Sequence, residues 1–312
     1  MEPYFLDYER VSHHKSMIGD SHRTDSYRKA IEKIVEKGDV VAEVGAGTGI
    51  LSFFAAKKAG KVYAIERTGI IEVAKQIGKS SKMGNVAFIK GESGRIRLPE
   101  RCDVIVSECL GYFAMQENMV SAVLDFRKRW LKKGGRVIPS SIAMFIAPVS
   151  DETAFENVSF WSEAGAKYAI DMGVLSDISS NSTYRHQFNP RSLLSKPKVV
   201  NKINMERDSS VRLDKKIDFV MRRNAVLHGF CGFFKAQLAP GVVLDTSPTR
   251  RTHWRQEYFP VVEPVPVKKR DRLSISVSAS LHKAYVDWNW SLSVNGGKES
   301  HSTRAGIQLK ER

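Results

Sequence analysis

The pattern of apolar residues changes near residue 140, and this change limits the possible folds more than any other feature of the sequence. Before that point, short apolar runs alternate with stretches whose apolar residues recur at helical spacing. The predicted strands span 40–44, 62–65, 86–89 and 104–106, and the predicted helices span 27–35, 50–59, 70–77 and 120–130. Strands that alternate with helices predict a parallel sheet with helices on both faces.

After residue 140, apolar residues recur at every second position. Leu273, Ile275, Val277, Ala279 and Leu281 alternate with polar residues, and a second alternating run leads into Asn295-Gly296, which favours a hairpin turn. The C-terminal half is therefore predicted to be an antiparallel, β-barrel-like or sandwich domain, with a helical insertion at about 155–200. We place one domain at residues 1–140 and the second at residues 141–312.

The composition is that of a soluble globular protein, with 42% hydrophobic and 27% charged residues. No apolar run has the roughly 18 residues that a membrane helix needs, and residues 1–10 do not resemble a secretory signal. Cys102, Cys109 and Cys231 have no metal-ligand spacing and leave one cysteine unpaired in any disulfide scheme. We therefore predict a reducing, cytoplasmic location, no membrane association and no metal site.

The net charge of +15 is the unusual global property. It favours attraction to nucleic acid, to acidic proteins or to other anionic surfaces. Lys and Arg are spread along the whole chain, however, so a role in solubility alone stays open.

A cluster of glycines stands where the first predicted strand meets the next helix, in the run Glu43-Val44-Gly45-Ala46-Gly47-Thr48-Gly49. Glycines let the backbone turn tightly and approach a ligand closely, beside the positive end of a helix. Ile50 stands where a dinucleotide fingerprint requires glycine, whereas Gly-x-Gly-x-Gly after an acid is typical of enzymes that use S-adenosylmethionine. A tight turn alone would explain the glycines. Glu66, at the end of the second strand, favours a cofactor site because an acid there can bind both ribose hydroxyls.

Two acids, Glu108 and Glu117, flank the loop that follows the strand at 104–106. Glu108 stands at the carboxyl end of that strand, where open α/β sheets bind ligands. Two neighbouring carboxylates repel each other unless a cation lies between them, and a guanidinium is a planar cation whose donors match carboxylates. From spacing alone, a guanidinium site is as good an interpretation as a polar strand end followed by a helix cap.

The chain resembles the protein arginine methyltransferases, from Tyr4 to about Lys310. The resemblance is carried by four motifs in the family's order: Tyr4-Phe5, Tyr8, His14, Met17, Asp20, Arg23-Thr24 and Tyr27 near the start; Glu43 to Gly49; Ser107-Glu108 through Glu117; and Thr252-His253-Trp254. It implies a Rossmann-like methyltransferase domain, a β-barrel-like domain, S-adenosylmethionine as methyl donor and arginine in a protein as acceptor. Met17 is associated in the family with monomethyl and asymmetric dimethyl products, a type I-like pattern.

The resemblance also implies a role for each matching residue. Glu108 and Glu117 would hold the target guanidinium, and His253 would pair with Asp20 and relay a proton. The cofactor would be bound by Arg23 at its carboxylate and Glu66 at its ribose, together with Glu43, Gly45, Gly47, Gly49 and Gly94. Tyr8, Met17, Met119 and Trp254 would line the acceptor side. A homodimer would form through an arm near 158–195, where Phe160-Trp161 and Tyr168 supply apolar anchors.

The chain departs from the family pattern at three places. Family members usually carry Asp at the position of Glu43, a change that keeps the charge. They commonly carry Trp-Met at Cys109-Leu110, so one wall of the acceptor pocket differs, and with it the expected substrate shape and number of methyl groups. Gly94 stands where an acid usually contacts the adenine, so that contact is not expected here.

Two alternatives stay open for the function. A typical substrate of the family is a basic Arg- and Gly-rich segment, which a protein of net charge +15 repels at long range. The first alternative is therefore a methyltransferase that acts on free arginine or another small guanidine or amine. The second is a catalytically weak cofactor-binding scaffold associated with nucleic acid or ribonucleoprotein, against which the intact Glu108, Glu117 and His253 argue.

Overall fold

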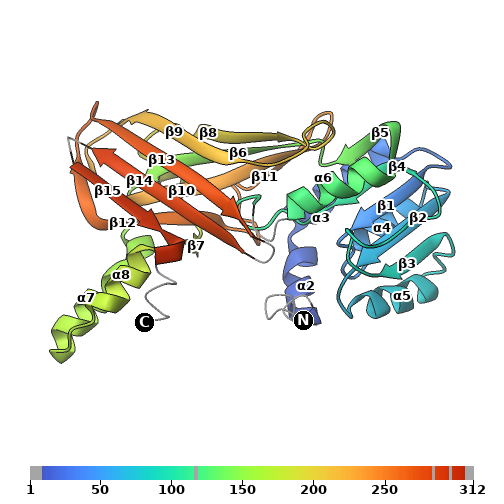
Figure 1. The fold of residues 1–312 in the computed structure, drawn as a ribbon, viewed down its shortest axis with the longest axis horizontal. Coiled ribbons are helices and arrows are strands. Elements are labelled where there is room, and N and C mark those ends of the chain that lie inside the picture. Colours follow the sequence, from blue (N-terminus) through green and yellow to red (C-terminus); the bar gives the residue numbers. More distant parts are fainter. Residues whose placement is uncertain (1–8, 116–118, 283–284, 295–296, 306–312) are drawn as a thin grey trace.

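The computed structural model describes residues 9–115, 119–282, 285–294 and 297–305 (Figure 1). One parallel sheet lies at one end of the molecule and two antiparallel sheets lie at the other. Helix α3 (Ser21–Ile34) stands between them and contacts strands of both parts. The predicted combination of a Rossmann-like domain and an antiparallel β domain is confirmed.

The parallel sheet has five strands in the order β3-β2-β1-β4-β5. They are β1 (Val40–Val44), β2 (Lys61–Glu66), β3 (Val86–Lys90), β4 (Cys102–Ser107) and β5 (Leu131–Ile138). The first four lie on the predicted runs, because the Val and Ile side chains of a parallel strand are buried on both faces of the sheet. The prediction lacks β5, whose Lys and Gly residues at 132–135 interrupt the apolar pattern.

Helices pack against this sheet through apolar stripes. Besides α3, they are α4 (Ile50–Ala56), α5 (Ile71–Ser80) and α6 (Met119–Trp130). Helix α2 (Val11–Gly19) contacts α3 instead, and its buried residue is His14. Tyr27, Ala30 and Ile31 of α3 are fully buried, as their spacing of three and four residues predicts. Asp20 caps α3 by accepting a hydrogen bond from N of Arg23 at 3.1 Å. The cap fixes where α3 begins and therefore where Arg23 lies.

The β domain consists of two antiparallel sheets. The first has the order β7-β12-β10-β6-β8, with β11 paired to β10, and the second has the order β15-β14-β13-β9. The strands are β6 (Ser141–Val149), β7 (Tyr184–His186), β8 (Lys198–Asn204), β9 (Leu213–Val220), β10 (Ala225–Ala239), β11 (Val242–Asp245), β12 (Gln256–Val267), β13 (Arg272–Leu281), β14 (Val286–Val294) and β15 (Gly297–Ser302). No closed barrel is found among the described residues, since each sheet ends in edge strands: β7, β8 and β11 in the first, β15 and β9 in the second. The sandwich form of the prediction therefore describes this domain better than a barrel.

The predicted helical insertion is a helical hairpin, α7 (Glu152–Tyr168) and α8 (Gly173–Ser180), which extends away from the β sheets (Figure 1). The helices end earlier than the predicted range of 155–200. Residues 184–186 already form β7, and a short 3-10 turn, Pro190–Ser192, precedes β8. None of the described helices has the length and apolar character needed to cross a membrane.

An aromatic cluster joins the loop after β4 to the β domain. The ring of Phe113 lies 5.8 Å from Phe259 and 5.4 Å from Trp288, measured between centroids, and all three rings are buried. The packing of Phe113 against Phe259 and Trp288 holds the residues that follow Glu108 against the β domain. The two domains are also joined directly by the chain, since β5 ends at Ile138 and β6 begins at Ser141.

Candidate active site

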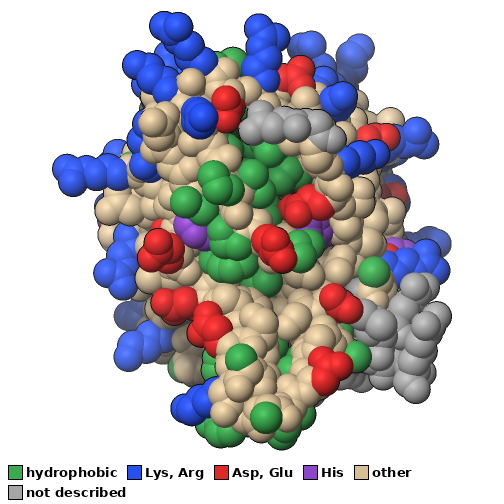
Figure 2. Space-filling view, turned by 90° about the vertical axis from the view of Figure 1, so that its left-hand side faces the viewer, with side chains coloured by type: hydrophobic (Ala, Val, Ile, Leu, Met, Phe, Trp, Pro, Cys, Tyr) green, Lys and Arg blue, Asp and Glu red, His purple; other side chains and the backbone are tan. Residues whose placement is uncertain are grey.

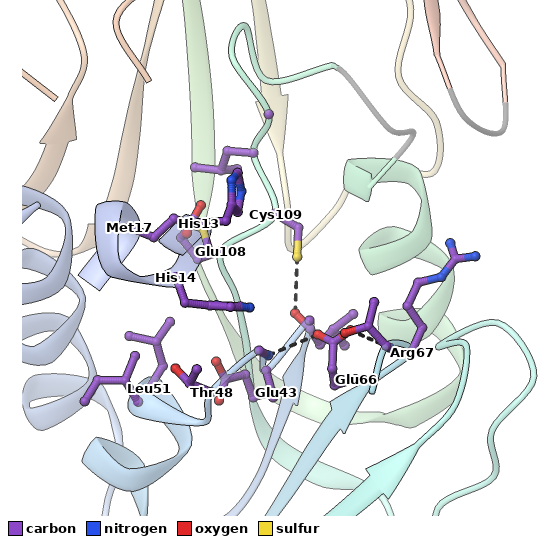
Figure 3. Close-up of a pocket in the computed structure, with 18 of the residues that line it drawn as sticks. His13, His14, Met17, Glu43, Thr48, Leu51, Glu66, Arg67, Glu108 and Cys109 are labelled. Carbon is purple, nitrogen blue, oxygen red and sulfur yellow. Dashed lines mark hydrogen bonds between the residues drawn. The ribbon is translucent and has the colours of Figure 1, made fainter. Parts of the chain in front are cut away.

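A cavity of about 390 Å³ lies at the carboxyl ends of β1, β2 and β4, facing loops of the β domain. Figure 3 shows side chains from α2, from the strand ends and from the segment after β4 converging on it. The predicted site residues that line it are Met17, Arg23, Glu43, Gly45, Gly47, Glu66, Gly94, Glu108, His253 and Trp254. The structure thus brings predicted site residues from both halves of the chain to one cavity.

The glycine loop is packed too closely for side chains. Gly45 and Gly47 have φ angles of 78° and 53°. A Cβ on Gly45 would stand 2.3 Å from Sγ of Cys109, and a Cβ on Gly47 would stand 2.9 Å from Cε1 of His14. Gly49, the N-cap of α4 with φ 85°, packs against Phe53 and does not contribute to the cavity lining. The backbone itself therefore forms this wall of the cavity.

The carboxylate of Glu66 is fixed by three hydrogen bonds. Its Oε2 accepts from N of Gly47 at 3.0 Å, while its Oε1 accepts from N and Oγ1 of Thr68 at 2.8 and 2.9 Å. Glu66 is buried at the end of β2 and lines the cavity. These bonds hold the glycine loop and the acid in one fixed arrangement.

Glu43 is buried deeper in the wall, at 2% exposure. Its carboxyl group accepts a hydrogen bond from the Ser52 hydroxyl. Burial raises the pKa of Glu43 to about 8, although the bonds from Ser52 and the charge of Arg23 act in the opposite direction. A carboxyl group with this pKa is mostly protonated at neutral pH, so the charge expected from the family pattern is largely absent.

Arg23 and Glu108 form a buried ion pair. Nε and Nη2 of Arg23 both contact Oε2 of Glu108. Burial disfavours the charge on Arg23, but the carboxylate of Glu108 outweighs it and raises the pKa of Arg23 above its usual value. Oε1 of Glu108 accepts no hydrogen bond from the described part of the chain. One carboxylate oxygen is therefore used for the ion pair and the other is left for a ligand.

Asp20 and His253 form a second pair beside the cavity. Oδ2 of Asp20 lies 3.0 Å from Nδ1 of His253 and accepts from the backbone N of the same residue at 2.8 Å. Burial raises the pKa of Asp20, but the hydrogen bonds from His253 and Arg23 bring it below its usual value. Asp20 itself does not line the cavity. It ties the start of α3 to the Thr252-His253-Trp254 loop.

Comparisons with known proteins match most of the chain. Residues 35–205 match the model of a methyltransferase domain, and residues 140–293 match that of the arginine methyltransferase oligomerization subdomain. Protein arginine N-methyltransferase 6 of Xenopus tropicalis is 33% identical over 293 residues, covering 89% of this chain and 86% of that protein. This chain belongs to the protein arginine methyltransferases.

Two solved structures of the family share the fold of this methyltransferase. The Trypanosoma brucei PRMT1 enzyme–prozyme heterotetrameric complex with AdoHcy has a TM-score of 0.87 and 24% identity, covering 95% of this chain and 99% of the matched chain. Arabidopsis thaliana protein arginine methyltransferase 10, in an open conformation, has a TM-score of 0.82 and 28% identity, covering 96% and 100%.

Membership of the family confirms the predicted enzyme class and methyl donor. Protein arginine methyltransferases are transferases that depend on S-adenosylmethionine. Membership also supports arginine in a protein, and not free arginine, as the methyl acceptor. It supports an active enzyme over the alternative of a catalytically weak scaffold. The comparisons do not connect this methyltransferase with nucleic acid, so that partner stays a prediction from its charge.

The departures from the family pattern now have structural settings. Cys109 packs against the glycine loop, and its Sγ lies 3.5 Å from the carbonyl oxygen of Val44. Leu110 is 3% exposed and also lines the cavity. Gly94 is exposed on the rim, with open space where a side chain would stand. The wall at Cys109 is therefore smaller than the tryptophan of the family pattern would make it.

Some residues of this methyltransferase's site were not assigned by sequence reasoning. His14 packs against Gly47, Thr68 binds Glu66, and Arg185 of β7 joins His253 and Trp254 on the β-domain side of the cavity. His14 stands at the family's spacing, which was the available signal for it. Arg185 belongs to none of the four motifs, so the sequence offers no signal for it.

Three predicted site residues cannot be placed in the site. Tyr8 and Glu117 lie outside the described residues. Met119 is the first residue of α6, but the structure does not describe its side chain. The roles of these three residues stay predictions.

Proposed function

We propose that this methyltransferase transfers a methyl group to a guanidinium nitrogen of arginine side chains in proteins, and that Glu108 and Glu117 hold that guanidinium. The observation that carries the proposal is the setting of Glu108. Arg23 binds its Oε2, which keeps the carboxylate in place, while Oε1 has no donor from the described residues and belongs to a side chain on the cavity wall. An acceptor guanidinium would donate to this oxygen.

The residues present fit the cofactor of the family. The glycine loop leaves no room for a Cβ at Gly45 or Gly47, as a close approach of a ligand to the backbone requires. Glu66 would bind the ribose, Gly94 would lie near the adenine, and Arg23 would bind the carboxylate through a donor that Glu108 does not use. When bound, S-adenosylmethionine supplies an electrophilic methyl group on its sulfonium.

The protein contributes orientation and charge. A protonated guanidinium is a poor nucleophile, and its very high pKa prevents easy deprotonation before the reaction. Two carboxylates would concentrate its positive charge away from the attacking nitrogen and align that nitrogen. The proton released would pass to Glu117 or, through Asp20, to His253. The lowered pKa of Asp20 keeps this carboxylate ionised beside His253.

We propose further that two copies associate through the α7–α8 arm. Exposed apolar residues gather on it: Phe160, Tyr168, Ile170, Val174 and Leu175 are 38–61% exposed. Figure 2 shows hydrophobic side chains at the lower end of the face where Figure 1 places the arm. The match of 140–293 to an oligomerization subdomain supports this use. Light scattering should give a dimer mass for the wild type and a monomer mass for Tyr168→Ser, with Val243→Ser on β11 as an exposed apolar control.

We also propose a reducing compartment such as the cytoplasm. Cys102 and Cys231 are buried, and burial raises the pKa of Cys102 to about 12 and that of Cys231 well above its usual value. Thiols held protonated in this way react slowly with oxidants. Fractionation of the source cells with an antibody to the chain tests the location.

The activity is tested by transfer of labelled methyl from S-adenosylmethionine to an Arg-Gly-rich peptide, to its Lys-substituted twin and to free arginine. Labelling of the Arg peptide alone, lowered at least ~100-fold by Glu108→Gln or Glu117→Gln, supports the proposal. Glu72→Gln, an exposed acid on α5, is the control for loss of one negative charge. Labelling of free arginine in preference to the peptide would contradict a protein acceptor.

A further inference from the structure

Arg185 contributes a positive charge to the acceptor side of the cavity. It is the central residue of the short edge strand β7, opposite Glu257 of β12. The described β-domain residues that line the cavity are Arg185, His253 and Trp254. Because the parallel-sheet domain supplies the glycine loop of the cofactor site, we assign the β-domain residues of the lining to the acceptor side. The exposed side chain of Arg185 is therefore placed to meet the acceptor.

Two contacts hold the guanidinium of Arg185 in one place. Its Cζ stands 3.9 Å from the ring centroid of Tyr112, and its Nη2 donates to the carbonyl oxygen of His253 at 3.0 Å. Tyr112 belongs to the loop that begins at Glu108, so Arg185 lies across two segments of the active site. A planar guanidinium stacked on an aromatic face loses little further freedom when it binds a second group.

Most of the hydrogen-bonding capacity of Arg185 is unused within the described residues. A guanidinium has five N–H donors, and the contact of Arg185 with Tyr112 lies over the ring of the tyrosine. The contact to His253 uses one nitrogen. No carboxylate of the described residues lies within 4.0 Å of Arg185, unlike Arg23, whose charge is paired with Glu108. The unpaired edge is suited to a bidentate contact with a carboxylate.

A fixed cation at this position opposes a purely basic acceptor. The target arginine brings its own positive charge, and the chain as a whole carries +15. Repulsion between like charges across an interface selects against such partners. An acceptor that carries a carboxylate beside the target arginine removes this penalty and gains a charge-assisted hydrogen bond.

We propose that Arg185 binds a carboxylate of the methyl acceptor, so that this enzyme prefers arginines next to an acidic group. The carboxylate comes either from an Asp or Glu side chain that flanks the arginine or from the chain terminus when arginine is the last residue. The proposal rests on the proposed methylation of arginine and adds the substrate class to it.

The test measures kcat/KM for a set of short acetylated peptides with one arginine. Three amidated peptides have Gly, Asp or Lys after the arginine, and a fourth ends in arginine with a free carboxylate. The wild type should prefer the Asp or the free-carboxylate peptide to the Gly peptide by about tenfold, and the Lys peptide should be the poorest. The preference should decrease as salt rises. The Asp and free-carboxylate peptides distinguish the two sources of the charge.

Variants of Arg185 separate charge recognition from a structural role. Arg185→Gln should reduce the preference to within about twofold, Arg185→Lys should keep part of it, and Arg185→Glu should favour the Lys peptide. Arg191→Gln, an exposed arginine outside the cavity, is the control and should keep the wild-type preference. A variant that lowers kcat equally for all peptides would instead show that Arg185 only positions Tyr112 and His253.

The proposal is overturned if the wild type methylates the Gly and acidic peptides equally, or if Arg185→Gln keeps the preference. Methylation of the Gly peptide in those cases would leave arginine methylation itself supported. Absence of labelling on every peptide would contradict the proposed function and the acceptor proposal together.

Discussion

Two nitrogens of Arg23 share a single oxygen of Glu108, and the two side chains are only 7% and 5% exposed. Removal of one member leaves the other charge buried without its partner, which costs about 3–5 kcal/mol in proteins. We predict that Arg23→Gln and Glu108→Gln each lower the free energy of unfolding of the protein by this amount. The double variant should lose about 3 kcal/mol less than the sum, as measured by denaturant unfolding.

The control for this coupling is an exposed pair on the same helix. Arg28 and Asp25 lie 3.2 Å apart, with 46% and 49% of their side chains exposed. Solvent screens such a pair, so the cycle of Arg28→Gln and Asp25→Asn should give a coupling below about 1 kcal/mol. Equal coupling in the two cycles would contradict the assignment of Arg23–Glu108 as a buried pair.

The contact between Gly45 and Cys109 gives a second prediction. Gly45→Ala should be destabilising for two reasons: φ is 78°, and the new Cβ would stand 2.3 Å from Sγ of Cys109. Gly38→Ala has only the first problem, because Gly38 has φ 91° and open space around it. We expect a cost of about 1–2 kcal/mol for Gly38→Ala and about 1–3 kcal/mol more for Gly45→Ala.

Cys109→Ala removes the sulfur and should recover the additional cost in the Gly45→Ala background, but not the cost of the positive φ. Thermal or denaturant unfolding of the four proteins measures this. If Cys109→Ala gives no recovery, the cavity wall at this point adjusts without a clash and the prediction is wrong.

Asp20 combines a helix cap with a carboxylate bound to His253, and two substitutions separate these functions. Asn is a good N-cap, so Asp20→Asn should keep the cap, whereas Asp20→Ala should lose a further ~1 kcal/mol. The folded-state pKa of Asp20 lies below its usual value of 3.8. The stability that its charge contributes is therefore present above that pH and lost as pH falls through the folded-state pKa.

The check is the free energy of unfolding as a function of pH. The advantage of the wild type over Asp20→Asn should be constant near neutral pH and shrink as the pH falls below 3.8. An advantage that is independent of pH would mean that the carboxylate contributes through shape alone.

Most of the parallel sheet could be predicted because its signals are local. A strand such as β4 is buried on both faces, so Val104, Ile105 and Val106 stand together in the sequence as they do in the core. β5 could not be predicted, since Gly134 and Gly135 interrupt the run of apolar residues that marks the other strands. The pairing of the β domain into two sheets depends on which strands meet, and alternation of apolar residues is the same in a barrel and in a sandwich.

The sequence predicts those residues of the site that belong to recognisable motifs. Glu66, Glu108 and His253 each stand in a recognisable pattern, and the structure brings their neighbourhoods to one cavity. The ion pair of Arg23 with Glu108 joins residues 85 positions apart, and no local pattern indicates which charges meet. Arg185 depends on the same kind of long-range contact. The sequence therefore predicts which residues belong to the site better than it predicts their partners.

The carboxyl group of Glu43 should make the protein less stable as the pH rises. Burial raises its pKa from 4.5 to about 8 in the folded state. Because the unfolded chain releases this proton more easily, the stability present below pH 4.5 decreases as the pH rises towards 8. Between about pH 5 and 8 the decrease is on the order of 4 kcal/mol.

Glu43→Gln isolates this contribution, since the amide keeps an acceptor for the Ser52 hydroxyl and cannot ionise. Its free energy of unfolding should match that of the wild type near pH 5 and exceed it increasingly up to about pH 8, by a margin on the order of 4 kcal/mol. Glu72 is an exposed acid, so Glu72→Gln is the control for the loss of one negative charge. Parallel pH profiles for Glu43→Gln and the wild type would mean that Glu43 is ionised in the folded protein, and that this wall of the cofactor site is charged at neutral pH.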